Sequence, residues 1–151
     1  MRRIGYLIVI ALVLTACSSM NCPISHTVHA KFKLGETLTD TLTVRVLLHN
    51  GTDSVLLNRL VSADSFYLPM SYQGDVDVYY FDRIDSTGTT TDEVRVSKTN
   101  HPHFEAVECN PSVFHTITGV THTYNKLDSI VVGDKDVNYD ATKTHFRVYF
   151  K

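Results

Sequence analysis

The sequence predicts an all-β fold, an antiparallel β-sandwich of immunoglobulin-like or related topology. In several short segments apolar residues alternate with polar ones, as in strands that have one buried and one exposed face. Polar turns separate these segments, and no long amphipathic helix lies between them. A small closed barrel is the alternative. We expect a single domain over residues 23–151, after an N-terminal segment of a different kind.

Strict alternation predicts the first two strands. The first has apolar side chains at every second position, at Val28, Ala30, Phe32 and Leu34. The second has them over residues 42–48 and leads into Asn50-Gly51, a strong hairpin signal, before an apolar run at 55–57. Residues 56–61 also fit a helical spacing, in a stretch too short to decide.

Six more strand-like runs follow the hairpin. They cover residues 76–84, 93–97, 104–107, 113–124, 129–132 and 145–150. Gly88 lies in a polar turn between the first two of these runs. We therefore expect antiparallel strands joined by short turns over the whole domain.

Residues 1–16 have the features of a lipoprotein signal peptide. Arg2 and Arg3 form a positive start, and residues 4–14 form an apolar stretch too short to remain as a membrane span. We interpret Cys17 as the first mature residue, its thiol carrying a diacylglycerol and its amino group a further acyl chain such as palmitate. Residues 17–22 would then form a short lipidated tether. An uncleaved anchor helix, or a secretory signal with a coincidental cysteine, is the alternative.

The residues after Cys17 suggest where the anchor resides. Ser18 follows the cysteine directly, and no acidic cluster is present over residues 18–21. This pattern favours the outer membrane, and its periplasmic side over the cell surface.

Cys22 and Cys109 remain as a pair once Cys17 is assigned to lipid. A structural disulfide is the default for such a pair in an oxidising compartment, so we predict a bridge between them.

The charge balance argues against nucleic acid as a partner. Without Arg2 and Arg3, the basic residues fall from 14 to 12 against 16 acidic residues. No basic cluster is present to neutralise phosphates.

A candidate metal site lies near the end of the chain. Asp134, Asp136, Asn138 and Asp140 alternate as in the first part of a calcium loop. Tyr139 and His145 then stand where such a loop needs glycine and glutamate, and a polar turn explains the same residues.

Other polar and aromatic residues admit both a functional and a structural interpretation. His101, His103 and Glu105 could share a transition metal or lie in a solvated loop. His115, in phase with Val113 and Ile117, suggests a half-buried core histidine. Aromatic residues gather at Tyr67, Tyr72, Tyr79, Tyr80 and Phe81, as a binding surface or as cross-strand pairs.

Catalytic signatures are not found in the sequence. It contains no GxSxG elbow, HExxH motif or phosphate-cradling glycine loop. The carboxylate pairs Asp75/Asp77 and Asp82/Asp85 are explained by surface charge as well as by glycosidase chemistry. We therefore do not expect an enzyme or a cofactor.

Several segments resemble an uncharacterised family of small Bacteroidota lipoproteins. The segments that carry the resemblance are Cys22-Pro23, Val55–Arg59, Cys109–Ile117 and Val137–Asp140. The resemblance implies a location and a fold more than an activity, and it assigns no functional residue.

These observations favour a non-enzymatic accessory or interaction protein of the cell envelope. Its anchor would hold it to the membrane, and its partner would be another envelope protein. A lipoprotein that captures glycan or calcium through its loops is the second hypothesis.

Overall fold

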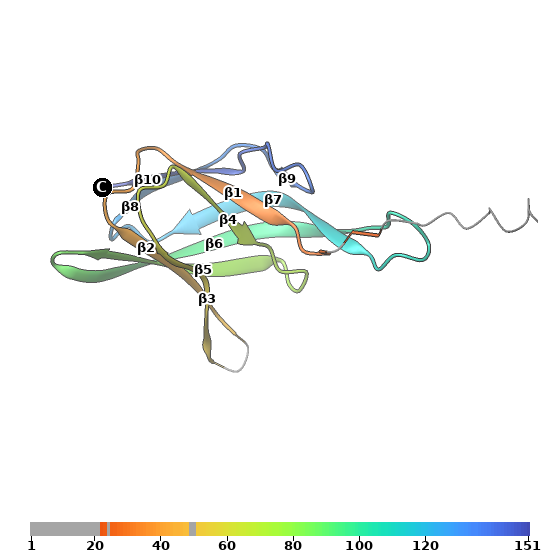
Figure 1. The fold of residues 1–151 in the computed structure, drawn as a ribbon, viewed down its shortest axis with the longest axis horizontal. Coiled ribbons are helices and arrows are strands. Elements are labelled where there is room, and N and C mark those ends of the chain that lie inside the picture. The colour runs from red at the N-terminus through yellow and green to blue at the C-terminus, as the bar shows by residue number, and fades with distance from the viewer. Residues whose placement is uncertain (1–21, 24, 49–50) are drawn as a thin grey trace, which may run out of the picture.

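Two β-sheets pack face to face in the computed structural model, which describes residues 22–23, 25–48 and 51–151 (Figure 1). One sheet has the strand order β4-β1-β10-β8, and the other has the order β3-β2-β5-β6-β7-β9. The strands are β1 (His29–Leu34), β2 (Thr41–Leu47), β3 (Asp53–Leu60), β4 (Ser65–Pro69), β5 (Val76–Asp85), β6 (Gly88–His103), β7 (Ser112–His122), β8 (Leu127–Val132), β9 (Asp136–Val137) and β10 (Phe146–Phe150). The predicted β-sandwich is confirmed.

The core lies between the two sheets and is centred on Phe32 of β1. Its ring stacks on Phe66 at 5.2 Å and on Phe146 at 4.5 Å, both within the four-stranded sheet. It also meets the edges of Tyr79 and Phe81 from β5 in the six-stranded sheet. All five side chains are buried, because each stands at an inward position of an alternating strand.

The strand pairings are antiparallel except for β1 with β10, which run parallel with Phe32 opposite Phe146. A parallel pair cannot be closed by a tight hairpin. Nearly the whole domain separates these two strands, so no local pattern could predict their pairing.

The predicted hairpin is present, and the helical alternative for residues 56–61 is wrong. β2 and β3 pair antiparallel, and Gly51 has a φ of 78°, in the left-handed region that favours glycine. Arg59 and Ser62 each have a φ of 51°, which is incompatible with a continuous right-handed helix. Residues 49–50, the rest of the turn, lie outside the described residues.

The predicted strand at residues 104–107 is wrong. The chain leaves β6 at His103 and turns, with the Cys109 N–H donating to the Ala106 carbonyl at 3.1 Å. The apolar residues that suggested a strand, Phe104 and Val107, are exposed in this loop. β4 and β9 were not predicted, because both are short and β4 ends in proline.

The predicted disulfide between Cys22 and Cys109 is confirmed, with a Cα–Cα distance of 5.5 Å. It ties the start of the described chain to the loop before β7. Cys17 and the rest of the predicted signal and tether, residues 1–21, lie outside the described residues. Within the described residues, no helix has the length and apolar character needed to cross a membrane.

One buried carboxylate organises the connection from β7 to β8. Asp92 of β6 is fully buried and accepts hydrogen bonds from the backbone N–H groups of Asn125, Lys126 and Leu127 at 2.8 to 3.0 Å. The Thr123 hydroxyl donates to it at 2.7 Å. Burial alone would raise the pKa of Asp92, but these donors together lower it below the ordinary value of 3.8.

We predict that Asp92→Asn lowers the free energy of unfolding by about 1–3 kcal/mol, because the new amide presents a donor to backbone donors. Because folding lowers the pKa of Asp92, the ionised Asp92 carboxylate of the wild type stabilises the folded state above pH 3.8. This stabilisation is lost as the pH falls through the lower pKa of the folded state. Urea unfolding at neutral pH checks the loss. The exposed neighbour Asp128, as Asp128→Asn, is the control, and equal stability of the two variants would contradict the assignment.

Candidate functional site

The inner face of the six-stranded sheet is not covered along its whole length. On β2, the inward residues Leu42 and Val44 are fully buried, Val46 is partly buried, and Leu48 just beyond the strand is 47% exposed. Because alternate residues point to the same face, the face that forms core at Leu42 becomes surface near Leu48. The four-stranded sheet therefore leaves an apolar end of its neighbour bare.

A groove of about 540 Å³ opens at this bare end. The β2–β3 hairpin forms one wall, and the connection from β4 to β5 forms the other. Its lining residues are Thr27, Val46, Leu47, Leu48, Leu56, Pro69, Met70, Ser71, Tyr72, Gln73, Val76, Asp77, Val78 and Tyr79. Leu47, Leu48, Val76 and the 67%-exposed Tyr72 are among the large exposed apolar side chains of the protein. Because exposed apolar surfaces with a hollow are typical of binding sites, this groove is the candidate site.

A buried ion pair supports the floor of the groove. The Lys98 side chain is completely buried, and its Nζ lies 3.4 Å from Oδ1 of Asp77 and donates to the Gly74 carbonyl at 2.9 Å. The other Asp77 oxygen accepts from the Ser71 N–H at 3.2 Å, and the Tyr79 hydroxyl lies 3.4 Å from it. These contacts attach the β4–β5 connection to the sheet and so define the shape of the groove.

Burial alters the titration of both acidic groups at this floor. It raises the pKa of Asp77, while the neighbouring Lys98 ammonium opposes that rise. Burial and the Asp77 carboxylate raise the pKa of Tyr79 well above its usual value. Asp77 and Lys98 thus neutralise each other's charge. We therefore assign the pair a structural role and not that of a free acid or base.

His115 extends the same network. It lies on a core face, as predicted, but is buried rather than half-buried. Its Nδ1–H donates to Oδ1 of Asn100 at 2.8 Å, and Nδ2 of Asn100 donates to the Gly74 carbonyl at 2.9 Å. Burial, assisted by the positive charge of Lys98, lowers the pKa of His115 to about 4.

The candidate calcium ligands do not converge, and the polar-turn explanation fits their contacts. Oxygens of Asp134, Asn138 and Asp140 each accept the backbone N–H two residues on, at 2.8 to 3.0 Å, as in local turns. Asp136 lies in β9 and accepts from the Thr116 hydroxyl at 3.2 Å. Among the described residues, no group of three or more His, Cys, Asp or Glu is arranged to hold a metal ion.

The histidines considered as metal ligands make separate contacts. His101 lies 3.1 Å from the Thr99 hydroxyl. His103 pairs with Glu105 at 3.0 Å and stacks on Phe114 at 4.3 Å.

The aromatic cluster divides between different surfaces. Tyr79 and Phe81 lie in the core. The Arg45 guanidinium carbon lies over the Tyr80 ring, 4.8 Å from the ring centroid. Tyr67 lies near the Lys31 ammonium. Tyr72 and the buried Tyr79 both line the groove, and Tyr72 is the exposed one of the two.

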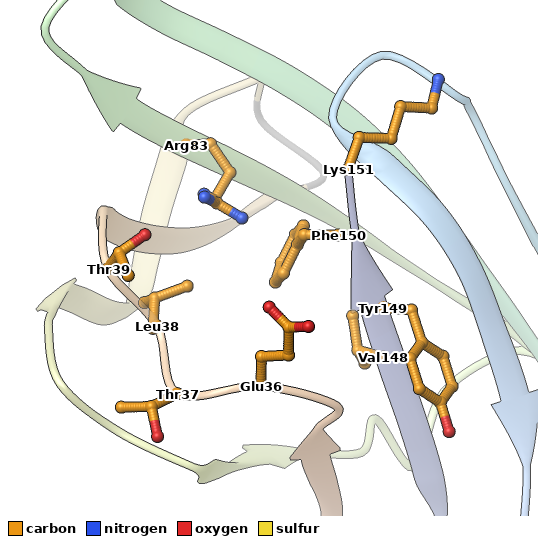
Figure 2. A pocket seen from close by; sticks show the side chains of 9 residues that line it. All are labelled: Glu36, Thr37, Leu38, Thr39, Arg83, Val148, Tyr149, Phe150 and Lys151. Atoms are coloured by element: carbon orange, nitrogen blue, oxygen red, sulfur yellow. The ribbon is translucent and has the colours of Figure 1, made fainter.

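A smaller pocket of about 150 Å³ surrounds Arg83 (Figure 2). The buried guanidinium pairs with Asp40 and stacks on the Phe150 ring at 4.2 Å, so that it joins β5 to β10 across the two sheets. Its Nε is buried and has no hydrogen-bond partner among the described residues. This arginine was not predicted as a contact between the sheets, and we assign it that structural role.

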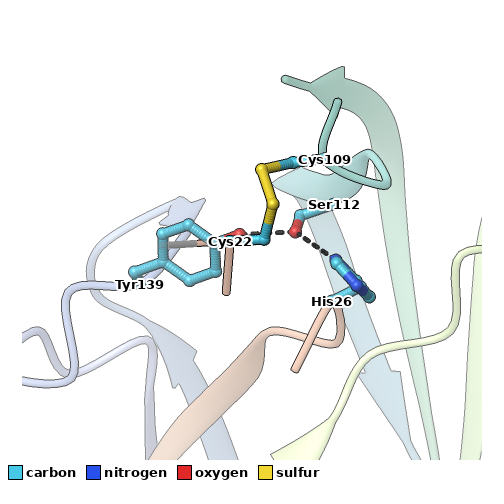
Figure 3. The surroundings of a disulfide bond; sticks show 5 residues. All are labelled: Cys22, His26, Cys109, Ser112 and Tyr139. Atoms are coloured by element: carbon cyan, nitrogen blue, oxygen red, sulfur yellow. Dashed lines mark hydrogen bonds between the residues drawn. A yellow bond between two sulfur atoms is a disulfide. The ribbon is translucent and has the colours of Figure 1, made fainter. Parts of the chain in front are cut away.

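A serine and a histidine meet beside the disulfide (Figure 3). Ser112 Oγ lies 3.4 Å from His26 Nδ1 and accepts a hydrogen bond from the Tyr139 hydroxyl. The pair has the composition of a nucleophile with its base, but Ser112 is 1% exposed and so is closed to a substrate. The network instead holds His26 against β7, next to the bridge from Cys22.

We predict that Lys98→Met lowers the free energy of unfolding by about 3–5 kcal/mol, because Asp77 is then left buried without its partner. Asp77→Asn in the same chain should recover part of the loss. Urea unfolding of both single variants and the double variant measures this coupling, and additive losses would contradict the pairing.

We also predict that stability falls as the pH decreases from 6.5 to about 4, since the unfolded His115 gains a proton that the folded one resists. The loss is on the order of 3 kcal/mol. Urea unfolding across this range should show a shallower slope for His115→Asn. His29→Asn, which removes a histidine from the surface without touching this network, is the control; equal slopes for His115→Asn and wild type would refute the prediction.

Comparison with known proteins gives a family but no activity. No curated protein matches the chain, and no solved structure matches it. The model of a family of unknown function, DUF6452, matches residues 41–150, which is more than half of the chain. The match includes three of the four segments on which the resemblance was based and confirms an uncharacterised family. The chain belongs to the DUF6452 family, a family of unknown function.

Proposed function

We propose that this protein is a lipid-anchored accessory protein of the bacterial outer membrane, on its periplasmic side, that binds an extended apolar segment of another envelope protein. The observation that carries the proposal is the groove at the bare end of the six-stranded sheet. Its volume of about 540 Å³ and its exposed leucine, valine and tyrosine side chains suit apolar side chains of a partner.

The position of β3 supports an extended partner. β3 lies at the edge of the six-stranded sheet, next to β2, and contributes Leu56 to the groove. An edge strand offers backbone donors and acceptors to an added strand, and a neighbouring groove receives that strand's alternate side chains. The two features together provide affinity from the backbone and selectivity from the side chains.

The proposed anchor at Cys17 explains how a shallow groove could suffice. Attachment to the bilayer confines the protein and a membrane-bound partner to the same surface and raises their effective concentration. A modest intrinsic affinity then gives high occupancy. Binding without catalysis agrees with a floor whose charged groups are paired and whose Ser112 is buried.

A glycan is the second candidate ligand. Tyr72 is 67% exposed beside the groove, and an aromatic face of this kind can stack on a sugar ring.

Site-specific photocrosslinking in living cells tests the proposed function. With a photoreactive phenylalanine analogue at Tyr72, we expect one dominant adduct whose crosslinked peptide comes from a single envelope protein. Leu48→Asp should abolish that adduct, because it introduces a charge into the apolar wall.

The matched control is Val131→Asp on β8, which has similar exposure and does not line the groove. It should leave the adduct unchanged. An adduct that survives Leu48→Asp would contradict docking in the groove, and an adduct with a glycan would replace the protein partner by the second candidate.

A further inference from the structure

The loop between β6 and β7, residues 104–111, carries apolar side chains that the described part of the chain leaves exposed. Val107 is 97% exposed and Phe104 is 63% exposed. The loop projects at one end of the molecule, beyond the ends of β6 and β7 (Figure 1). Apolar side chains held at a projecting tip are costly in water unless another surface receives them.

The disulfide fixes this loop beside the start of the described chain. Cys109 belongs to the loop, and its bridge to Cys22 holds the two Cα atoms 5.5 Å apart. Figure 1 shows the two segments together at the same end of the molecule. The Tyr139–Ser112–His26 contacts hold His26 against β7 close to the bridge (Figure 3).

The distance from the bridge to the proposed anchor is short. Cys22 is five positions after Cys17, and a fully extended chain covers at most about 3.6 Å per residue, so Cys22 lies within roughly 18 Å of Cys17. If Cys17 carries lipid, the 104–111 loop is at the membrane end of the protein, whatever path the tether takes.

We infer that the 104–111 loop is a second membrane contact, in which Phe104 and Val107 enter the interfacial layer of the bilayer that holds Cys17. The inference rests on the lipid anchor of the proposed function. Phe and other apolar residues placed at the headgroup–acyl boundary stabilise such contacts. The loop also carries Glu105 and Glu108, so the chemistry fits zwitterionic lipids better than anionic ones.

This contact would set the orientation of the whole domain. β6 and β7 run away from the loop, so the β5–β6 turn at Gly88 faces away from the membrane. Val76 and Asp77, at the groove, pair with Ser97 and Val96, which lie seven and eight residues along β6 from Phe104 at the start of the loop. At about 3.3 Å per residue, the groove then lies roughly 25 Å from the bilayer surface, within reach of a membrane-anchored partner.

Tryptophan fluorescence tests the contact directly, because the chain has no tryptophan of its own. Val107→Trp and Tyr124→Trp each introduce one at an exposed position. Tyr124 follows the far end of β7 and is therefore the matched control. The full lipidated protein is incorporated into phosphatidylcholine–phosphatidylethanolamine vesicles with acyl chains brominated near the headgroup, and far-UV circular dichroism verifies the fold of both variants.

We expect brominated lipid to quench most of the Val107→Trp emission and to leave Tyr124→Trp unchanged. Equal quenching of the two variants, or none at residue 107, in protein that floats with the vesicles would overturn the membrane contact while the anchor stands. Protein that does not float with the vesicles would remove the anchor and, with it, this inference.

Discussion

The packing of Phe32 between the two sheets is the contact on which the other features depend. Its ring stacks on Phe66 and Phe146 in its own sheet and meets Tyr79 and Phe81 across the core, so it determines where the four-stranded sheet sits on its neighbour. Burial of large aromatic side chains supplies much of the stabilising free energy in a domain of this size. Because the smaller sheet is centred there, the end of the larger sheet near Leu48 remains uncovered.

The uncovered end is shaped by polar groups rather than by more core. The buried Lys98 bonds to Gly74 and pairs with Asp77, and His115 reaches the same carbonyl through Asn100. A buried ion pair contributes little net stability compared with apolar packing, but it tolerates few alternative arrangements. The ion pair therefore holds the groove wall in one position, and the fold is less stable than it would be with apolar packing there. A loss of stability of this kind is common at functional sites.

Local alternation predicted much of the fold and little of the site. The pattern around Phe32 and the Asn50-Gly51 signal identified β1 and the β2–β3 hairpin correctly. The parallel pairing of β1 with β10 has no local signature. Alternation places Leu48 on the same face as the buried Leu42 and Val44, but it could not show that the second sheet ends before it reaches Leu48. Lys98, a charged residue in phase with Val94 and Val96, was one signal for the groove floor. Asp77 was another, because it is in phase with Tyr79 and Phe81 and is buried rather than part of the surface charge.

Side-chain footprinting of the protein in its native membrane tests most directly whether the groove is occupied. Hydroxyl-radical oxidation would be compared between isolated outer membranes and the purified protein, at Tyr72 and Leu48 in the groove and at the equally exposed Tyr124 outside it. A bound partner predicts several-fold lower oxidation of Tyr72 and Leu48 in the membranes, with Tyr124 unchanged. Equal oxidation of the groove residues in both samples would contradict a binding role for the groove.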